Sequence, residues 1–215
     1  LLENEIHYIY YTPWDSFRSK HPLFNLLYPE KSRDFMRSLV RIYHATGILP
    51  EPQVMTGVHL SALVADALAK GITDFDVETV YQGLADMILH PPYFRPLMKY
   101  FEALGHVPYP QRYATTATLE FAYNDWALAQ VARYLGKTED VRKLEKRSLN
   151  YRNHFNPENR FMETNKEDGS WAEASIYAEA DPLNMTWFVP HDSQGLINLM
   201  GGEAAFNEHL DRNFR

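Results

Sequence analysis

Eight Asp and Glu residues are candidates for a catalytic acid, base or nucleophile. Six of them fall in residues 152–190, a long stretch rich in Phe, Tyr and Trp. A carboxyl group in partly apolar surroundings can protonate a leaving group, while a second carboxylate attacks the substrate or activates water. Hydrolysis of a glycosidic bond needs these two roles. Residue types alone do not rank the candidates, which are Asp15, Glu163, Glu167, Asp168, Glu173, Glu179, Asp181 and Asp192.

Structural explanations compete with the catalytic ones. Asp15 could cap the segment that follows it, because Asp is common at helix starts. Asp192 directly precedes a predicted helix, so capping of that helix is its favoured interpretation. Glu179, judged from the residues alone, is best explained as a solvated loop residue.

The elements that would position these residues are mostly helices. Residues 1–12 are β-prone and predict a short extended lead-in that Pro13 ends. Helical spacing of apolar residues, closed by Gly or Pro, then predicts most of the remaining elements. The expected helices span 29–46, 57–70, 76–89, 96–104, 116–135, 138–150, 193–200 and 204–214.

This pattern predicts an all-α fold. No fixed-period repeat of the kind found in solenoids is present, which favours part of an (α/α)6 toroid. We expect one helical domain over residues 1–215, incomplete as a toroid. The irregular stretch 152–190 is too aromatic for a disordered segment, and long ordered loops are usually functional. It is where we expect the active site.

Composition limits the function classes. The formal net charge is -7 with no basic stripe, which argues against nucleic-acid binding. No apolar run approaches the roughly 20 residues of a membrane helix, and the first residues carry no signal-peptide pattern. The absence of Cys excludes disulfides and thiolate chemistry but does not determine the compartment.

Several segments resemble successive motifs of family 92 glycoside hydrolases, in the family's order and over nearly the whole chain. They are Trp14-Asp15-Ser16-Phe17-Arg18, Thr118 to Trp126, Gly169-Ser170-Trp171, Thr186 to Asp192, and Leu199-Met200-Gly201-Gly202. The resemblance implies a calcium-dependent, inverting exo-α-mannosidase that acts on mannose-containing glycans. Its site would lie between an N-terminal β-sandwich and the toroid, with the β-sandwich, the general base and the calcium ligands outside residues 1–215. Family members mostly act outside the cytoplasm, which implies a secreted, periplasmic or cell-surface protein.

The resemblance also assigns residues. Tyr177-Ala178-Glu179 matches a Tyr-x-Glu motif that carries the general acid, so Glu179 is the predicted acid, with a pKa raised by partial burial beside Tyr177 and Trp187. Asp15 would bind hydroxyls of the terminal sugar, and Trp14 would offer an apolar face. His191 and Asp192 are further candidates for the wall of the substrate site.

Two departures from the family pattern keep alternatives open. Val58 replaces an acidic residue before His59, a histidine that is better explained as structural than as a ligand. Residues 180–185 replace a run that reads approximately Gly-Asn-x-Trp-Gln-Tyr in the family. The alternatives are a non-catalytic carbohydrate-binding or interaction module on the same scaffold, and a different α/α-toroid glycosidase.

Overall fold

A computed structural model describes residues 6–9, 12–51, 55–90 and 96–215. The chain divides into two compact units. The first unit comprises the described residues up to 90 together with Asn124–Glu145, and the second comprises Pro96–Tyr123 and Lys146–Arg215. The prediction of a single domain over 1–215 stays a prediction.

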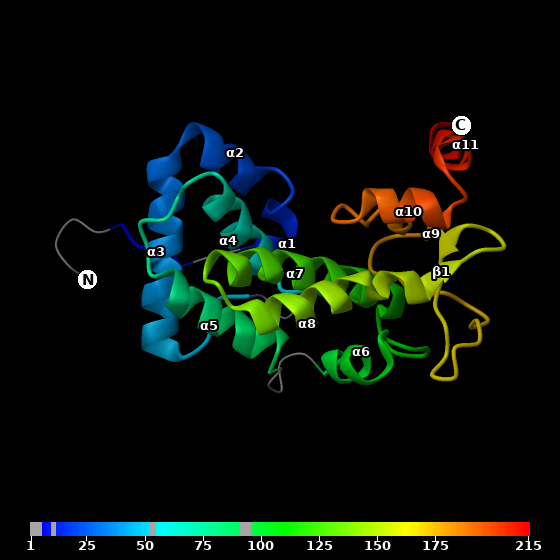
Figure 1. Cartoon of the computed structure of the whole chain (residues 1–215), viewed down its shortest axis with the longest axis horizontal. Helices are drawn as coiled ribbons and strands as arrows, with labels where there is room; N and C mark the ends of the chain where they lie inside the picture. The colour runs from blue at the N-terminus through cyan, green and yellow to red at the C-terminus, as the bar shows by residue number, and fades with distance from the viewer. Residues whose placement is uncertain (1–5, 10–11, 52–54, 91–95) are drawn as a thin grey trace. The chain divides into compact units, whose positions relative to one another are not determined.

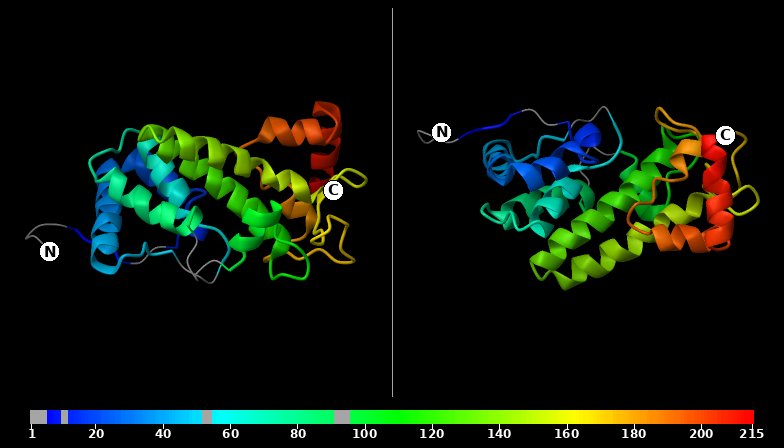
Figure 2. Two further views of the ribbon diagram at one scale, coloured as in Figure 1. Left: turned by 60° about the horizontal axis from the view of Figure 1, so that its bottom comes forward. Right: turned by 90° about the horizontal axis from the view of Figure 1, so that it is seen from above.

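The first unit is built from helices. These are α1 (Pro13–Ser16), α2 (Lys20–Leu27), α3 (Pro29–Thr46), α4 (Leu60–Ala69) and α5 (Val77–Ile88), with the later part of α7 (Ala114–Tyr134) and the earlier part of α8 (Thr138–Ser148). Helix α2 packs on α3 and α4, and α3 packs on α5 (Figure 1). The end of α7 lies beside α8, where Arg133 and Glu145 form an ion pair (Figure 2).

Local sequence signals explain the helix boundaries. Pro29 occupies the first turn of α3, and Gly47 ends this helix with φ +71°. Asp76 caps α5 by accepting a hydrogen bond from the Thr79 amide at 3.0 Å. Both helices were predicted within one or two residues, whereas α4 begins three residues later than expected.

A buried polar cluster of the first unit surrounds His59. The Asn124 side chain accepts a hydrogen bond from the Val58 amide at 2.6 Å and lies 3.2 Å from His59 Nδ1 through its amide nitrogen. The His59 ring stacks on Phe17 with centroids 4.3 Å apart. These contacts support the structural role expected for His59.

The second unit holds the irregular stretch. Its elements are α6 (Met98–Leu104), the start of α7, the end of α8, η1 (Leu149–His154), β1 (Phe155–Asn156), β2 (Phe161–Met162), α9 (Pro182–Met185), α10 (Ser193–Leu199), α11 (Glu203–Asp211) and η2 (Arg212–Phe214). Strands β1 and β2 form an antiparallel pair with Phe155 opposite Met162. A core that includes Phe101, Leu119, Tyr151, Met162 and Leu196 joins α6, α7 and α10 to the loops.

The described residues bear out the helical class. Helices α1, α2 and α9 and the short β1–β2 pair were not predicted. Residues 6–9 of the expected lead-in are neither helix nor strand, and residues 1–5 and 10–11 of it lie outside the described residues. In the part of the chain that the structure describes, no helix is both long and apolar enough to cross a membrane.

Candidate active site

Glu179 lies on a segment that is held from both sides. Before it, Ile176 accepts a hydrogen bond from the Thr115 amide at 3.1 Å, and the Ala178 amide donates to Thr116 Oγ1 at 3.0 Å. After it, Asp181 caps α9 by accepting from the Asn184 amide at 2.9 Å. The flanking residues are therefore fixed to α7 and α9.

The backbone turns sharply at Glu179 itself. Its φ is +50°, in the left-handed region that residues with a side chain seldom adopt. Ala178 is buried, whereas the Glu179 side chain is exposed. Left-handed backbone at a non-glycine residue is often found at functional sites, where the surrounding structure maintains it.

The partial burial expected for Glu179 is wrong. The left-handed turn directs the carboxyl group to solvent while Ala178 occupies the buried position. The two expected apolar neighbours make other contacts. The Tyr177 hydroxyl donates to the Met162 carbonyl at 2.6 Å, and the Trp187 ring packs on Phe206 and His209.

Thr115 and Thr164 support this segment from behind, while Thr118 and His154 hold residue 163 beside it. Thr115 and Thr164 join their hydroxyls at 2.7 Å, and Thr164 Oγ1 accepts the Ile176 amide at 2.8 Å. His154 lies 2.5 Å from the Glu163 carbonyl through Nδ1 and 2.8 Å from Thr118 through Nε2. Burial lowers the pKa of His154 to about 3, so its ring is neutral.

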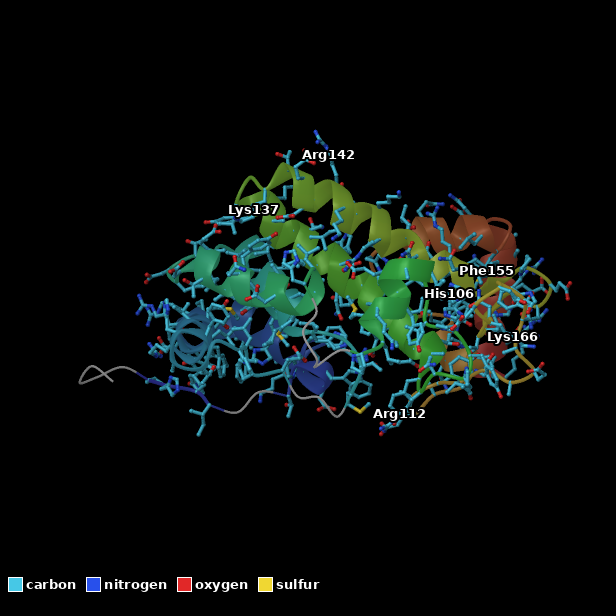
Figure 3. All side chains as sticks on the ribbon, turned by 90° about the horizontal axis from the view of Figure 1, so that it is seen from below. His106, Arg112, Lys137, Arg142, Phe155 and Lys166 are labelled. Atoms are coloured by element: carbon cyan, nitrogen blue, oxygen red, sulfur yellow. The ribbon has the colours of Figure 1, made fainter. Side chains whose placement is uncertain are left out.

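His106 extends this support to the neighbouring loop. Its ring nitrogens lie 3.2 Å from the Leu104 carbonyl and 3.1 Å from the Lys166 carbonyl. Figure 3 shows His106, Phe155 and Lys166 in the same region of the second unit. The loop before Glu179 is thus tied both to the end of α6 and to α7.

Asp192 is a structural hub of the second unit. It caps α10 by accepting from the Gly195 amide at 3.0 Å, and it accepts hydrogen bonds from the Tyr151 hydroxyl at 2.7 Å and from Arg152 at 2.8 Å. Burial opposes ionisation, but these donors lower the pKa of Asp192 below its usual range. The predicted capping role is confirmed.

The neighbouring His191 is packed between aromatic rings. Its Nε2 lies 2.9 Å from the Ser148 carbonyl, and its ring makes an edge contact with Tyr151 at 5.5 Å. Burial lowers the pKa of His191, which favours the neutral ring. A neutral imidazole here can hydrogen-bond a hydroxyl group but carries no charge.

Trp14 and Asp15 belong to the first unit. Trp14 is half-buried, with the Arg18 guanidinium 5.3 Å from the centre of its ring. Asp15 is exposed within α1, and neither α1 nor α2 has a side-chain cap, so the capping alternative for Asp15 is wrong. The remaining predicted site residues, Glu179, His191 and Asp192, all lie in the second unit.

A family model tests one of these alternatives. The model for the glycosyl hydrolase family 92 catalytic domain matches residues 2–215. The chain belongs to glycosyl hydrolase family 92. Membership confirms the resemblance drawn from the motifs and removes the alternative of a different α/α-toroid glycosidase family.

Solved family 92 structures share this fold. The inverting mannosidase BT2199 of Bacteroides thetaiotaomicron is 34% identical, with a TM-score of 0.87 over 93% of this chain and 30% of that one. The α-mannosidase BT3965 of the same organism, solved with mannoimidazole, is 28% identical with a TM-score of 0.83, covering 93% and 29%. The chain is therefore part of an α/α-toroid glycosidase fold, as predicted.

A curated relative extends the comparison to a fungus. An uncharacterized secreted glycosidase of Arthroderma benhamiae is 25% identical over 91% of this chain and 31% of its own length. The chain thus spans about a third of the length of each of these relatives.

The donor set for calcium is not found among these residues. Within 6–9, 12–51, 55–90 and 96–215, no group of three or more His, Cys, Asp or Glu side chains is placed to hold a metal ion. The residues that the structure describes do not fit a calcium site of their own.

Sequence reasoning missed the residues that hold the site in place. Thr116, Tyr151 and Arg152 carry hydrogen bonds to the Glu179 segment or to Asp192, and none was singled out. Three threonines at 115, 116 and 118, close together at the start of a helix with many apolar residues, were the available signal. Buried hydroxyls need hydrogen-bond partners, so such a run predicts contacts across the helix.

Proposed function

We propose that this chain is part of an exo-acting α-mannosidase that removes terminal α-mannose from glycans with inversion, and that Glu179 is its general acid. The observation that carries the proposal is the exposed Glu179 carboxyl group on a left-handed turn that α7 and α9 hold on both sides. The two solved relatives described as an inverting mannosidase and an α-mannosidase support the substrate class.

The reaction assigns one step to Glu179. As the bond between the anomeric carbon and the glycosidic oxygen breaks, the protonated carboxyl group gives its proton to that oxygen. A water molecule attacks the anomeric carbon from the opposite face and loses its proton to a second carboxylate, about 6.5–9.5 Å from the first in inverting enzymes. We propose that this second carboxylate lies outside residues 1–215, and we assign it to no residue of this chain.

The exposure of Glu179 fits an acid that substrate covers. A bound sugar would remove water from the carboxyl group and bring the glycosidic oxygen within hydrogen-bond reach, about 2.6–3.2 Å. The fixed turn would hold the carboxyl group in place before the substrate arrives. Little reorganisation is then needed in the transition state.

The other predicted substrate residues differ in their exposure and in the hydrogen bonds that they already make. Asp15 is exposed, so its carboxylate can bind sugar hydroxyls, while half-buried Trp14 would present an apolar face. Asp192 already accepts three hydrogen bonds, which makes indirect support of the site its better role. We retain His191 as a neutral hydrogen-bonding group of the site wall.

Three further proposals concern the complete protein: its calcium requirement, its other domains and its location. We propose a calcium requirement with ligands outside this chain, together with an N-terminal β-sandwich and the remainder of the catalytic domain. We also propose secretion or a periplasmic or surface location. Its support is the Arthroderma benhamiae relative, which is described as secreted.

The test is release of mannose from α-mannobiosides by the complete gene product, with and without a chelator. Removal of the acid should lower kcat by about 10²–10⁴-fold in Glu179→Gln. The matched control is Glu173→Gln, because Glu173 is an exposed glutamate of the same stretch that pairs with Lys166 at 2.6 Å. It should keep its activity.

Two outcomes would contradict the proposal. Equal activity of Glu179→Gln and Glu173→Gln would remove Glu179 from the mechanism. A complete protein that binds α-mannosides but hydrolyses none would favour the alternative of a non-catalytic carbohydrate-binding module. The changed run at residues 180–185 is the feature that favours this alternative.

A further inference from the structure

A buried hydroxyl lies directly behind the Glu179 turn. Thr116, in the first turn of α7, is 1% exposed. Its Oγ1 accepts the Ala178 amide at 3.0 Å and donates to Met185 Sδ at 3.2 Å. One side chain therefore joins the residue before Glu179 to the last residue of α9.

These bonds differ from the common hydrogen bond of a threonine inside a helix. The common partner of such a hydroxyl is the carbonyl four residues earlier in the same helix. Thr118 follows this habit, donating to the Ala114 carbonyl at 3.0 Å, and so does Thr46 with Ile42 at 2.8 Å. Thr116 instead bonds across to the loop that carries Glu179.

Loss of this hydroxyl would release the turn. The Ala178 amide would stay buried without an acceptor, which is unfavourable enough to move the chain towards water. Left-handed backbone at a residue with a side chain persists only where its surroundings maintain it. The 178–181 segment would then relax to an ordinary backbone conformation and carry the carboxyl group away.

We propose that Thr116 is a positioning residue for the general acid, acting through the Ala178 amide. The inference rests on the proposed role of Glu179 as the acid. It adds a residue to the mechanism that touches neither substrate nor the reacting atoms.

The experiment compares two leaving groups in the complete enzyme. Methyl α-mannoside needs a proton at its leaving oxygen, whereas 2,4-dinitrophenyl α-mannoside releases a stable phenolate without one. In Thr116→Val, kcat for the methyl glycoside should fall about 10–100-fold while kcat for the dinitrophenyl glycoside changes less than about threefold. Thr116→Ser keeps the hydroxyl and should restore both values.

Thr118→Val is the matched control. Thr118 is also fully buried in α7 and would undergo the same substitution, but its hydroxyl serves Val107 and His154 rather than the Glu179 segment. A purely structural loss would lower activity on both substrates to the same extent. An equal loss on both substrates in Thr116→Val, or no loss at all, would overturn the proposal.

The two proposals fail in different ways. If Glu179→Gln itself loses no more activity on the methyl than on the dinitrophenyl glycoside, the acid assignment is wrong. If Glu179→Gln discriminates and Thr116→Val does not, only the positioning role is wrong. Should the valine variant not fold, the smaller Thr116→Ala takes its place. Hydrogen exchange at the Ala178 amide of the wild type then tests the bond, because rapid exchange there would contradict it.

Discussion

Gly57 occupies a position where a side chain has no room. Its φ is +86°, and an added Cβ would lie 2.6 Å from His59 Nε2 and 2.9 Å from Asn124 Oδ1. Left-handed backbone alone costs a residue with a side chain about 1–2 kcal/mol. Together with the displaced polar cluster, we expect Gly57→Ala to lower the free energy of unfolding by about 3 kcal/mol or more.

The control for this prediction is Gly47→Ala. Gly47 has a similar φ of +71°, but nothing lies within 4 Å of its added Cβ. It should therefore show only the conformational cost of about 1–2 kcal/mol. Thermal unfolding of the complete protein measures both variants. Equal shifts in Tm would show that the polar cluster around His59 can rearrange without loss of stability.

At the scale of elements, Asp192 should stabilise α10 and its surroundings more than Asp181 stabilises α9. Asp192→Ala removes the cap of α10, worth about 1 kcal/mol, and leaves the Tyr151 hydroxyl without its acceptor, at about 1–3 kcal/mol. Burial and the neighbouring Asp192 carboxylate raise the pKa of Tyr151 to about 12, although Arg152 acts in the opposite direction. The hydroxyl therefore stays protonated and needs the acceptor.

Two variants separate these effects. Asp181→Ala removes only the cap of the short α9 and should cost about 1 kcal/mol. Asp192→Asn preserves capping while it removes the charge, so it should fall between the wild type and Asp192→Ala. A denaturation series in which Asp181→Ala proves as destabilising as Asp192→Ala would contradict the hub role of Asp192.

Sequence reasoning located the regular helices but could not locate α2. Helix α3 is bounded by Pro29 and Gly47, and its apolar residues face inward, so periodicity found it. Helix α2 reverses this pattern, because His21 and Asn25 are buried while Leu23 and Leu26 are exposed. Asn25 donates to Asp66 at 2.7 Å, a tertiary contact that no local pattern reveals.

The candidate site was predictable to a similar degree. Motif resemblance identified Glu179, and the position of Asp192 before a helix correctly predicted its cap. The left-handed turn at Glu179 was not predictable, because the Ala178 amide acquires its acceptor only when residue 116 comes close in the fold. Burial at one residue of a loop depends on such contacts rather than on composition.

At the scale of the whole molecule, buried histidines contribute to the loss of stability in acid. Burial, with a smaller effect from Lys20, lowers the pKa of His21 to about 4, and burial lowers that of His154 to about 3. Unfolded histidine titrates near a pKa of about 6.5. Between these values the unfolded chain binds protons that the folded chain does not, so stability present above pH 6.5 declines as the pH falls.

The expected slope is about 1.4 kcal/mol per pH unit for each such histidine, from about pH 6 down towards the folded pKa. His21 packs against Phe24 and Phe35, so His21→Leu removes the titrating ring but retains apolar contacts. The Tm of His21→Leu should therefore fall less steeply than that of the wild type between pH 6.5 and about 4. His90→Leu, at a position that folding leaves exposed, should follow the wild-type curve. Parallel curves for His21→Leu and the wild type would mean that folding does not lower the pKa of His21. The loss of stability in acid would then have to arise from His154 and the carboxylates.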